Sequence, residues 1–312
     1  MEKRVKIGTR QSELAVWQAT HVQDLLKENG VDSELIFIKS EGDINTITPL
    51  YELGVQGIFT KTLDAALLGR KIDIAVHSMK DVPTLPATGI RIAAVLKRAS
   101  FKDILVFKGI RSQVDSELSY DHLPFKIATS STRRKAQWLH RYPGHIIENL
   151  RGNVNTRLRK LNEHDWNGVI FAAAGLERIG LRPQNSIDLD WMLPAPAQGA
   201  IAISCREDDT ISIEKCHQLN DESTFRCTTI ERDFLRTLLG GCSTPISALA
   251  VMEHDKVIFR GNICSVDGKK KFEIAKEASV KNSYDLGMNA ANELLQNTEV
   301  KQTLYDIRNA ER

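Results

Sequence analysis

Short apolar runs of β type alternate with amphipathic stretches through the first half of this chain, and this alternation restricts the fold more than any other feature. Strands are expected at residues 5–8, 35–38, 72–77 and 90–96, and helices at residues 11–29 and 59–68. Because strands separated by helical patterns form βαβ units, this part is expected to be an α/β domain with a mainly parallel sheet.

A second series of the same kind follows, and its opening resembles the opening of the first. Residues 6–12 and residues 126–132 both place a strand before a hydroxyl-rich turn and a helix. Such a turn presents backbone N–H groups at the positive end of a helix, which suits an anion. Further strands are expected at residues 104–107, 125–129, 145–149 and 168–171, with helices at residues 132–141 and 153–162. Two similar α/β domains facing one cleft are the expected arrangement.

The rest of the chain predicts a return to the first domain and then a small third domain of α+β type. Segment 193–199 contains two prolines and is expected to cross back, before a strand at residues 200–205. A helix is expected at residues 221–240, ending at a glycine pair. Antiparallel strands within residues 247–280, turning at Asp267-Gly268, and a helix at residues 283–296 are expected to follow. The expected domains are residues 1–99 with 199–218, residues 102–196, and residues 220–312.

Composition excludes several classes of function. With 312 residues, 42% apolar and 26% charged, the chain has the make-up of a globular protein of two or three domains. Its net charge of +2, without a basic block beside aromatic residues, argues against nucleic acid, and no apolar run is long enough for a membrane span. No metal site is predicted, because neither HExxH nor cysteine pairs at zinc-finger spacing occur. The five widely spaced cysteines indicate reduced thiols and a cytoplasmic protein.

Six arginines lie where apolar runs break into turns, although the chain as a whole is nearly neutral. They are Arg10, Arg133, Arg134, Arg151, Arg157 and Arg178. Taken singly, each arginine could be a solvent-exposed residue at the start of a helix, paired with a nearby Asp or Glu. This interpretation is weaker for Arg133, Arg134, Arg151 and Arg157, because no acid lies within residues 131–141 or 151–157. Guanidinium groups bind carboxylate or phosphate through planar, bidentate contacts. If these segments converge, the ligand carries several negative charges.

Two further side chains are candidates for chemistry. Cys242 follows a glycine pair and precedes Ser-Thr-Pro, which indicates an exposed turn that could present a nucleophile or a covalent attachment point. The alternative, a small buried thiol, suits Cys205 and Cys227 better. Asp81 lies just past the end of an expected strand, where ligands of α/β sheets gather. It could instead form an Asx turn before Pro83.

Several segments in the same order resemble the porphobilinogen deaminase family, also called hydroxymethylbilane synthases. The match runs from about residue 5 to 265 and is carried by residues 9–12, 77–83, 131–134, 150–157, 193–195, 198–200 and, throughout, 231–247. The resemblance implies two domains similar to periplasmic binding proteins around a cleft, with a third domain carrying the cysteine. It implies a dipyrromethane cofactor, joined by a thioether to Cys242. Four porphobilinogen molecules would be added to it in turn, each losing ammonia, before the linear tetrapyrrole hydroxymethylbilane is hydrolysed off.

The same resemblance implies roles for individual residues. Asp81 would be catalytic, stabilising the azafulvenium cation left by ammonia and managing protons. The cofactor would be bound by Arg133, Arg134, Lys80, Ser78, Thr129 and Ser131. The substrate porphobilinogen would be bound by Arg10, Ser12, Arg151, Arg157, Arg178, Phe59 and Gln198. A monomer is expected.

Two departures from the family pattern are visible. Gly54-Val55-Gln56-Gly57 stands where the family has Gly-Gly-Lys-Gly, and Ser204 stands where a glutamate is usual. Neither change touches Asp81 or Cys242. Two other functions stay open from the residues alone: a non-catalytic, two-lobed receptor for a small polyanion, and an enzyme that uses Cys242 as an acyl-transferring nucleophile.

Overall fold

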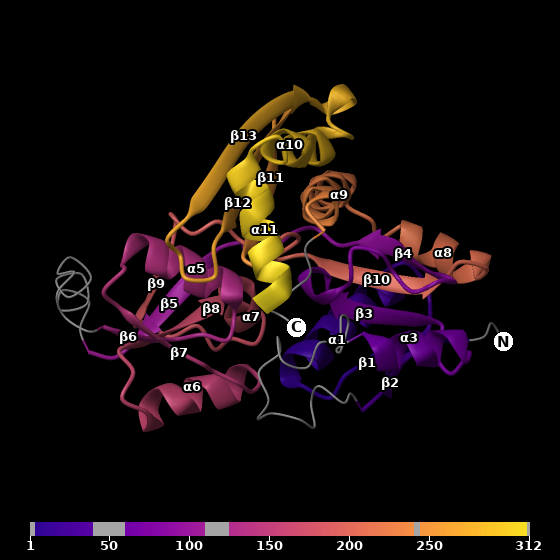
Figure 1. The fold of residues 1–312 in the computed structure, drawn as a ribbon. Helices are drawn as coiled ribbons and strands as arrows, with labels where there is room; N and C mark the ends of the chain where they lie inside the picture. Colours follow the sequence, from indigo (N-terminus) through magenta and orange to yellow (C-terminus); the bar gives the residue numbers. More distant parts are fainter. Residues whose placement is uncertain (1–3, 40–59, 110–124, 240–243, 311–312) are drawn as a thin grey trace.

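The computed structural model describes residues 4–39, 60–109, 125–239 and 244–310, which form two α/β lobes and a C-terminal unit (Figure 1). The first lobe contains a five-stranded sheet in the order β2-β1-β3-β10-β4. Strands β1 (Val5–Thr9), β2 (Ser33–Phe37) and β3 (Ile74–Ser78) are parallel, whereas β10 (Ile201–Arg206) is antiparallel to β3 and to β4 (Ile90–Val95). The prediction of a strand–helix series is confirmed for this part of the chain.

Helices cover both faces of the first sheet. Helices α1 (Glu13–Glu28) and α8 (Thr210–His217) pack on one face, and α3 (Lys61–Leu68) packs on the other. Alternate residues of β3 therefore enter different cores: Ile74 and Val76 meet α1, while Ala75 meets α3. A strand buried on both faces needs apolar side chains on both of them, which is why Ile74–Val76 of β3 are all apolar.

The second lobe repeats this pattern. Its sheet has the order β7-β6-β8-β5-β9. Strands β6 (Lys126–Ala128), β7 (Ile146–Glu148) and β8 (Gly168–Ala172) are parallel, and β5 (Asp103–Phe107) is antiparallel to β8 and to β9 (Ser186–Asp188). Its helices are α5 (Thr132–Arg141), α6 (Val154–Glu163) and α7 (Ala173–Glu177). The expectation of two similar α/β units agrees with this shared strand order.

Each sheet is mixed: four of its five strands run in one direction, in agreement with the expectation of a mainly parallel sheet, and one strand, β10 or β5, runs against them. Two segments, called crossings below, connect the lobes. The first, residues 96–102, leads from β4 of the first lobe to β5 of the second, and the other, residues 189–200, leads from β9 back to β10. Each crossing thus brings in a strand that runs against its neighbours. The crossings pack backbone to backbone at Gly199, where φ is +88° and a Cβ would lie 2.7 Å from the carbonyl oxygens of Ala99 and Ser100. Only glycine fits that conformation and that approach.

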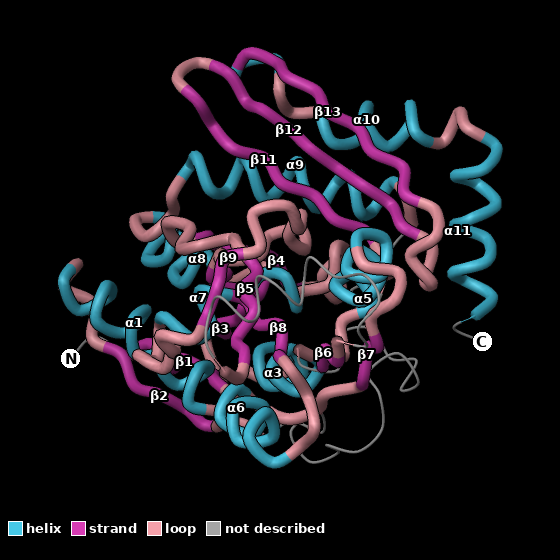
Figure 2. The backbone as a smooth tube through the Cα atoms, turned by 90° about the vertical axis from the view of Figure 1, so that its left-hand side faces the viewer, coloured by secondary structure: helices cyan, strands magenta, loops and turns pink. Residues whose placement is uncertain are grey.

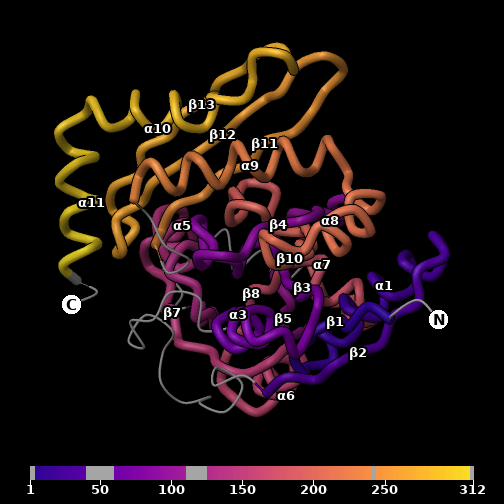
Figure 3. Tube along the Cα trace, turned by 90° about the vertical axis from the view of Figure 1, so that its right-hand side faces the viewer, coloured from indigo at the N-terminus to yellow at the C-terminus, as the bar shows by residue number. Residues whose placement is uncertain are grey.

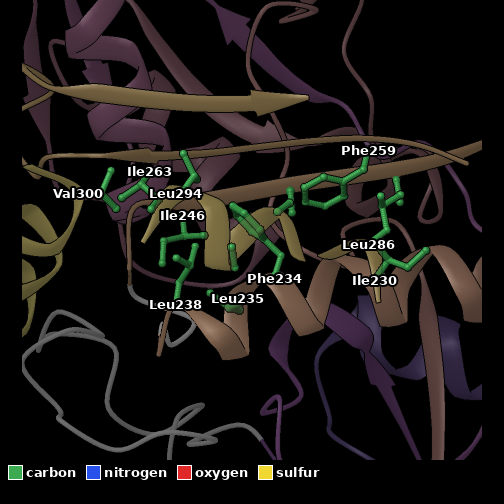
Figure 4. Packing of buried hydrophobic residues seen from close by; sticks show 14 of the residues in the cluster. Ile230, Phe234, Leu235, Leu238, Ile246, Phe259, Ile263, Leu286, Leu294 and Val300 are labelled. Atoms are coloured by element: carbon green, nitrogen blue, oxygen red, sulfur yellow. The ribbon is translucent and has the colours of Figure 1, made fainter. Parts of the chain in front are cut away.

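The C-terminal unit packs three helices on an antiparallel sheet of β11 (Ile246–Glu253), β12 (Lys256–Cys264) and β13 (Lys271–Ser279). Figures 2 and 3 show the sheet above α9 (Glu222–Thr237), with α10 (Leu286–Leu294) beside it and α11 (Thr298–Ala310) at one end. In its core, the Phe234 and Phe259 rings lie 5.1 Å apart between centroids (Figure 4). Gly261 allows this packing, since a Cβ there would come within 2.6 Å of the Phe234 ring.

Some elements differ from the sequence prediction. Helix α9 ends at Thr237, before the glycine pair, because Leu239 takes a left-handed conformation with φ of 54°. The short elements α7, α8 and β9 and the longer α11 were not predicted. The α11 pattern was visible nonetheless, since Val300, Leu304 and Ile307 recur at helical spacing and are buried. None of the helices in the described ranges is long and apolar enough to cross a membrane.

Candidate active site

Asp81 ends a short 3-10 turn (Met79–Asp81) directly after β3, as the sequence predicts. The residues on either side of it are anchored: Met79 is 1% exposed and its N–H donates to the carbonyl of Ala200 at 3.0 Å. Val82 is buried, and its N–H donates to the carbonyl of Met79. Asp81 itself stays half-buried. The turn therefore holds the carboxylate at the end of the strand on a fixed backbone.

Cations from both lobes interact electrostatically with Asp81. Lys80 comes from the first lobe, and Arg134 and Arg157 come from α5 and α6 of the second. Burial, and then Arg134, lower the pKa of Lys80 from 10.5 to about 8. Burial lowers the pKa of Arg157 to about 10, with Arg134 and Arg151 adding to the effect. Segments that are far apart in sequence thus converge on Asp81.

Asp103, the first residue of β5, connects this cluster and was missed from sequence. Its carboxylate is fully buried and accepts hydrogen bonds from Arg133 Nη1 at 2.7 Å, from Arg134 Nη2 at 2.7 Å and Nε at 3.0 Å, and from Gln198 Nε2 at 3.0 Å. Gln198 Oε1 in turn accepts from Lys80 Nζ at 3.2 Å. Burial alone would raise the pKa of the Asp103 carboxyl, but the two guanidinium groups hold it well below its usual range.

Arg133 and Arg134 thus have an acidic partner after all, although, as the sequence shows, it does not lie in the local stretch 131–141. Their partner lies 30 and 31 residues away in sequence and reaches α5 only because β5 begins beside it. The sequence does contain one indication of this partner, since a carboxylate, Asp103, directly precedes the apolar run 104–107. Arg134 also donates to the carbonyl of Ile170 at 3.0 Å, and Arg133 to that of Leu193 at 2.8 Å. Arg133 Nε is buried and has no hydrogen-bond partner among residues 4–39, 60–109, 125–239 and 244–310.

The hydroxyl residues at the start of α5 shape its first turn. Thr129 Oγ1 accepts the N–H of Ser131, and the Ser131 hydroxyl accepts the N–H of Arg134 as the N-cap. Further along the helix, Gln137 Nε2 donates to Ser247 Oγ of the C-terminal unit at 3.0 Å. Helix α5 is thus held at a fixed position by partners outside the second lobe.

The remaining predicted residues of the first lobe lie at the adjoining ends of β1 and β3. Ser12 is the N-cap residue of α1, without a side-chain capping bond. Ser78 Oγ accepts a hydrogen bond from Gln18 Nε2 at 2.9 Å. Burial, with Arg10 nearby, lowers the pKa of His77 to about 4, so this histidine is neutral.

Two predicted arginines of the second lobe are Arg178, which contacts the first lobe, and Arg151, which is buried. Arg178 Nη2 donates to the carbonyl of Gly199 at 2.7 Å, and its guanidinium carbon lies 5.9 Å from the Trp17 ring centroid. Burial lowers the pKa of Arg178 to about 10 and also lowers that of Arg151. Arg151 is 7% exposed. Both arginines are therefore held in surroundings with little water.

Phe59, Cys242 and the segment 54–57 lie outside the described residues. The other four cysteines are free and buried, which confirms the structural role expected for Cys205 and Cys227. Burial raises the pKa of Cys205 and Cys227 to about 11 and that of Cys216 and Cys264 to about 12. These thiols stay protonated and are poor nucleophiles. Ser204 is buried in β10, next to a register shift against β4.

A second buried carboxylate that the sequence analysis missed, Glu231 of α9, joins the C-terminal unit to the crossings. It is 0% exposed and pairs with Arg98 at 2.6 Å. It also accepts the N–H of Ala197 at 2.6 Å and that of Ala250 at 2.8 Å. Ala197 has a φ of 62°, which is unfavourable for a residue with a Cβ. The bond from Glu231 helps to hold this strained turn next to Gln198.

Comparison with known proteins identifies the family. The family model described as "Porphobilinogen deaminase, dipyromethane cofactor binding domain" matches residues 5–214, and "Porphobilinogen deaminase, C-terminal domain" matches residues 225–296. The chain belongs to the porphobilinogen deaminase family. The first match contains Asp81 and all the basic residues described above, and the second contains Cys242. The activity is therefore that of a porphobilinogen deaminase, which sets aside the receptor and acyl-transfer alternatives.

Full-length relatives agree with this assignment. The chain is 40% identical to the porphobilinogen deaminase of Acidithiobacillus ferrooxidans, over 99% of this chain and 100% of that protein. It is 38% identical to that of Syntrophomonas wolfei, over 94% and 96% of the two chains. Among solved structures, it is similar to the VFT2 domain of Bordetella pertussis BvgS, with 14% identity, a TM-score of 0.43 and coverage of 69% and 85%. An ancestral cationic amino acid solute binding protein also gives a TM-score of 0.43, with 14% identity and coverage of 69% and 87%.

Proposed function

We propose that the basic residues between the lobes bind the carboxylates of the dipyrromethane cofactor and of porphobilinogen. The observation that carries this proposal is the crowding of cations. Among the described residues, Lys80, Arg133, Arg134, Arg151 and Arg157 form one electrostatic cluster with two carboxylates, Asp81 and Asp103. Burial lowers the pKa of Lys80 and Arg157, and neighbouring arginines lower both values further. A bound polyanion would reduce this repulsion between like charges. Each pyrrole unit carries an acetate and a propionate, which supply such charges.

The residues present fit the cofactor. Lys80, Arg133, Arg134, Ser78, Thr129 and Ser131 would hold it, together with the thioether from Cys242. Within the described ranges, the buried Nε of Arg133 has no hydrogen-bond acceptor, so it is a donor available to a carboxylate of the cofactor. When bound, the cofactor supplies the pyrrole carbon to which the first substrate unit is joined. Arg10, Ser12, Arg151, Arg157, Arg178, Phe59 and Gln198 would bind substrate carboxylates or close over them.

Asp81 is the proposed catalytic carboxylate. Asp103 is committed to Arg133 and Arg134, so Asp81 is the acid of this described cluster left for chemistry. It would stabilise the positive charge that develops on porphobilinogen as ammonia leaves, and would exchange protons with the leaving amine and the attacking pyrrole. Lys80, Arg134 and Arg157 around it would keep substrate carboxylates oriented while this happens.

Replacing Arg157 by glutamine tests the carboxylate-binding proposal. Arg157→Gln is expected to lower kcat/KM for porphobilinogen about tenfold to hundredfold, the value of one charge-assisted hydrogen bond. The matched control is Arg159→Gln, two positions along α6, whose side chain is 63% exposed and pairs with Glu163. Equal kinetics in both variants, measured as ammonia release, would contradict the proposal.

The pKa of Lys80 predicts a pH dependence of ligand binding. In the Cys242→Ser protein, Lys80 loses its proton as the pH rises through about 8, and binding a carboxylate then requires proton uptake. The affinity for porphobilinogen, measured by calorimetry, should therefore fall above that pH by up to about tenfold per pH unit. Lys80→Met removes the titrating group and should flatten the profile. An unchanged slope in Lys80→Met would show that another group is responsible.

We also propose that one chain forms the complete site, so that the enzyme works as a monomer. The support is that Asp81, Arg134 and Arg157 come from two lobes of one chain. Light scattering should give the mass of a single chain.

The free, buried thiols support a cytoplasmic location, where cysteines stay reduced. The three sheets support the division into residues 1–99 with 199–218, 102–196 and 220–312.

A further inference from the structure

Helix α9 makes a second contact with the catalytic part of the molecule, through the residue that follows Glu231. Arg232 is 8% exposed. Its Nη1 donates to the carbonyl of Val82 at 2.8 Å, and its Nη2 donates to the carbonyl of Pro83 at 2.6 Å. These two carbonyls belong to the residues directly after Asp81. A side chain of the C-terminal unit is therefore hydrogen-bonded to the backbone of the segment that carries the catalytic carboxylate.

The geometry of this contact controls orientation as well as position. A guanidinium group is planar, so two bonds to consecutive carbonyls fix the direction of the peptide between them. On the other side of Asp81, the N–H of Met79 is bonded to the carbonyl of Ala200. Asp81 is thus held between an anchor inside the first lobe and an anchor from α9.

The same helix leads towards the cofactor attachment point. Arg232 precedes Cys242 by ten positions, and α9 ends at Thr237. Glu231 ties the helix to Arg98 and Ala197, so α9 is fixed against the lobes at two neighbouring positions. The contact of Arg232 therefore links the element that precedes the cysteine directly to the segment of Asp81.

We propose that Arg232 is a positioning residue, which sets Asp81 relative to the cysteine-bearing element. This inference rests on the proposed catalytic role of Asp81. Arg232 would not touch the substrate; it would act through the Val82 and Pro83 carbonyls. Loss of these two hydrogen bonds should allow Asp81 to shift, and a misplacement of about 1 Å can lower the rate about a hundredfold.

The test compares Arg232→Met with Arg226→Met in the holoenzyme. Arg226 lies on the same helix and donates to the Val280 carbonyl and the Tyr284 hydroxyl, both within the C-terminal unit. Intact mass reports cofactor loading, denaturant unfolding reports stability, and ammonia release reports kcat and KM. We expect Arg232→Met to keep the cofactor mass, lose about tenfold to a hundredfold in kcat and change KM little. Arg226→Met should lose stability without losing kcat per folded molecule.

A double-mutant cycle separates positioning from a merely structural role. If Arg232 acts through Asp81, Arg232→Met should have little further effect on the residual rate of Asp81→Asn. Independent, multiplying effects would overturn the proposal, and so would a kcat within twofold of wild type in folded Arg232→Met. Should Arg232→Met not fold, Arg232→Lys, which can reach one carbonyl, is expected to fold with an intermediate kcat; a wild-type kcat there would also refute it. Near-normal turnover of Asp81→Asn would instead show that the assigned role of Asp81 is wrong.

Discussion

Asp81→Asn is expected to lower the rate of ammonia release from porphobilinogen by about 10²- to 10⁴-fold, the usual contribution of a positioned acid–base group. Asparagine keeps the shape of the side chain but cannot carry a negative charge or exchange a proton. The loss should appear in kcat, because charge develops on the substrate only as ammonia leaves. Stability should change little, since Asp81 is half-buried on a turn held by its neighbours Met79 and Val82.

The control for this experiment is Asp306→Asn, which removes an exposed carboxylate on α11 that pairs with Gln302. It should turn over porphobilinogen at the wild-type rate. Intact mass should show the cofactor in both variants, so that a loss of rate cannot be ascribed to a missing primer. A loaded Asp81→Asn enzyme with near-normal ammonia release would remove Asp81 from the chemistry.

Cys242→Ser is expected to have the other large effect. The protein should lack the added mass of two pyrrole units, and formation of the tetrapyrrole should fall to the background rate, because the growing chain has no covalent anchor. Cys242→Ser exchanges one sulfur atom for oxygen at a position that the sequence places between the end of α9 and the start of β11, so the fold should be retained. Intact-mass spectrometry of the purified protein measures the adduct directly.

Cys227→Ala is the matched control, because this thiol is free and buried on α9, and burial raises its pKa to about 11. It should retain the adduct, whatever its cost in stability. An adduct of two pyrrole units on the Cys242→Ser protein would mean that another residue holds the cofactor. Absence of any adduct on the wild-type protein would mean that the thioether proposal is wrong.

Much of the site could be predicted because its residues lie in local patterns. Asp81 follows β3, Ser131 caps α5 and Arg157 lies in the first turns of α6, and each of these placements depends on a strand, a turn and a helix that are close in sequence. The partner of Arg133 and Arg134 could not be predicted in this way, since Asp103 reaches them across 30 residues. Similarly, nothing local indicates that Arg232 bonds to carbonyls 150 and 149 residues earlier.

The amino-acid sequence by itself determined the alternation of strands and helices, the two similar halves, the third unit and the family, because apolar periodicity, caps and motifs are written in neighbouring residues. Only the tertiary structure decided that the sheets are mixed, since strand direction depends on where the two crossings re-enter each lobe. It also decided that buried carboxylates at Asp103 and Glu231 hold the arginines and crossings in place. A buried charge needs an oppositely charged or hydrogen-bonding partner, and which residue provides it depends on packing in space rather than on order along the chain.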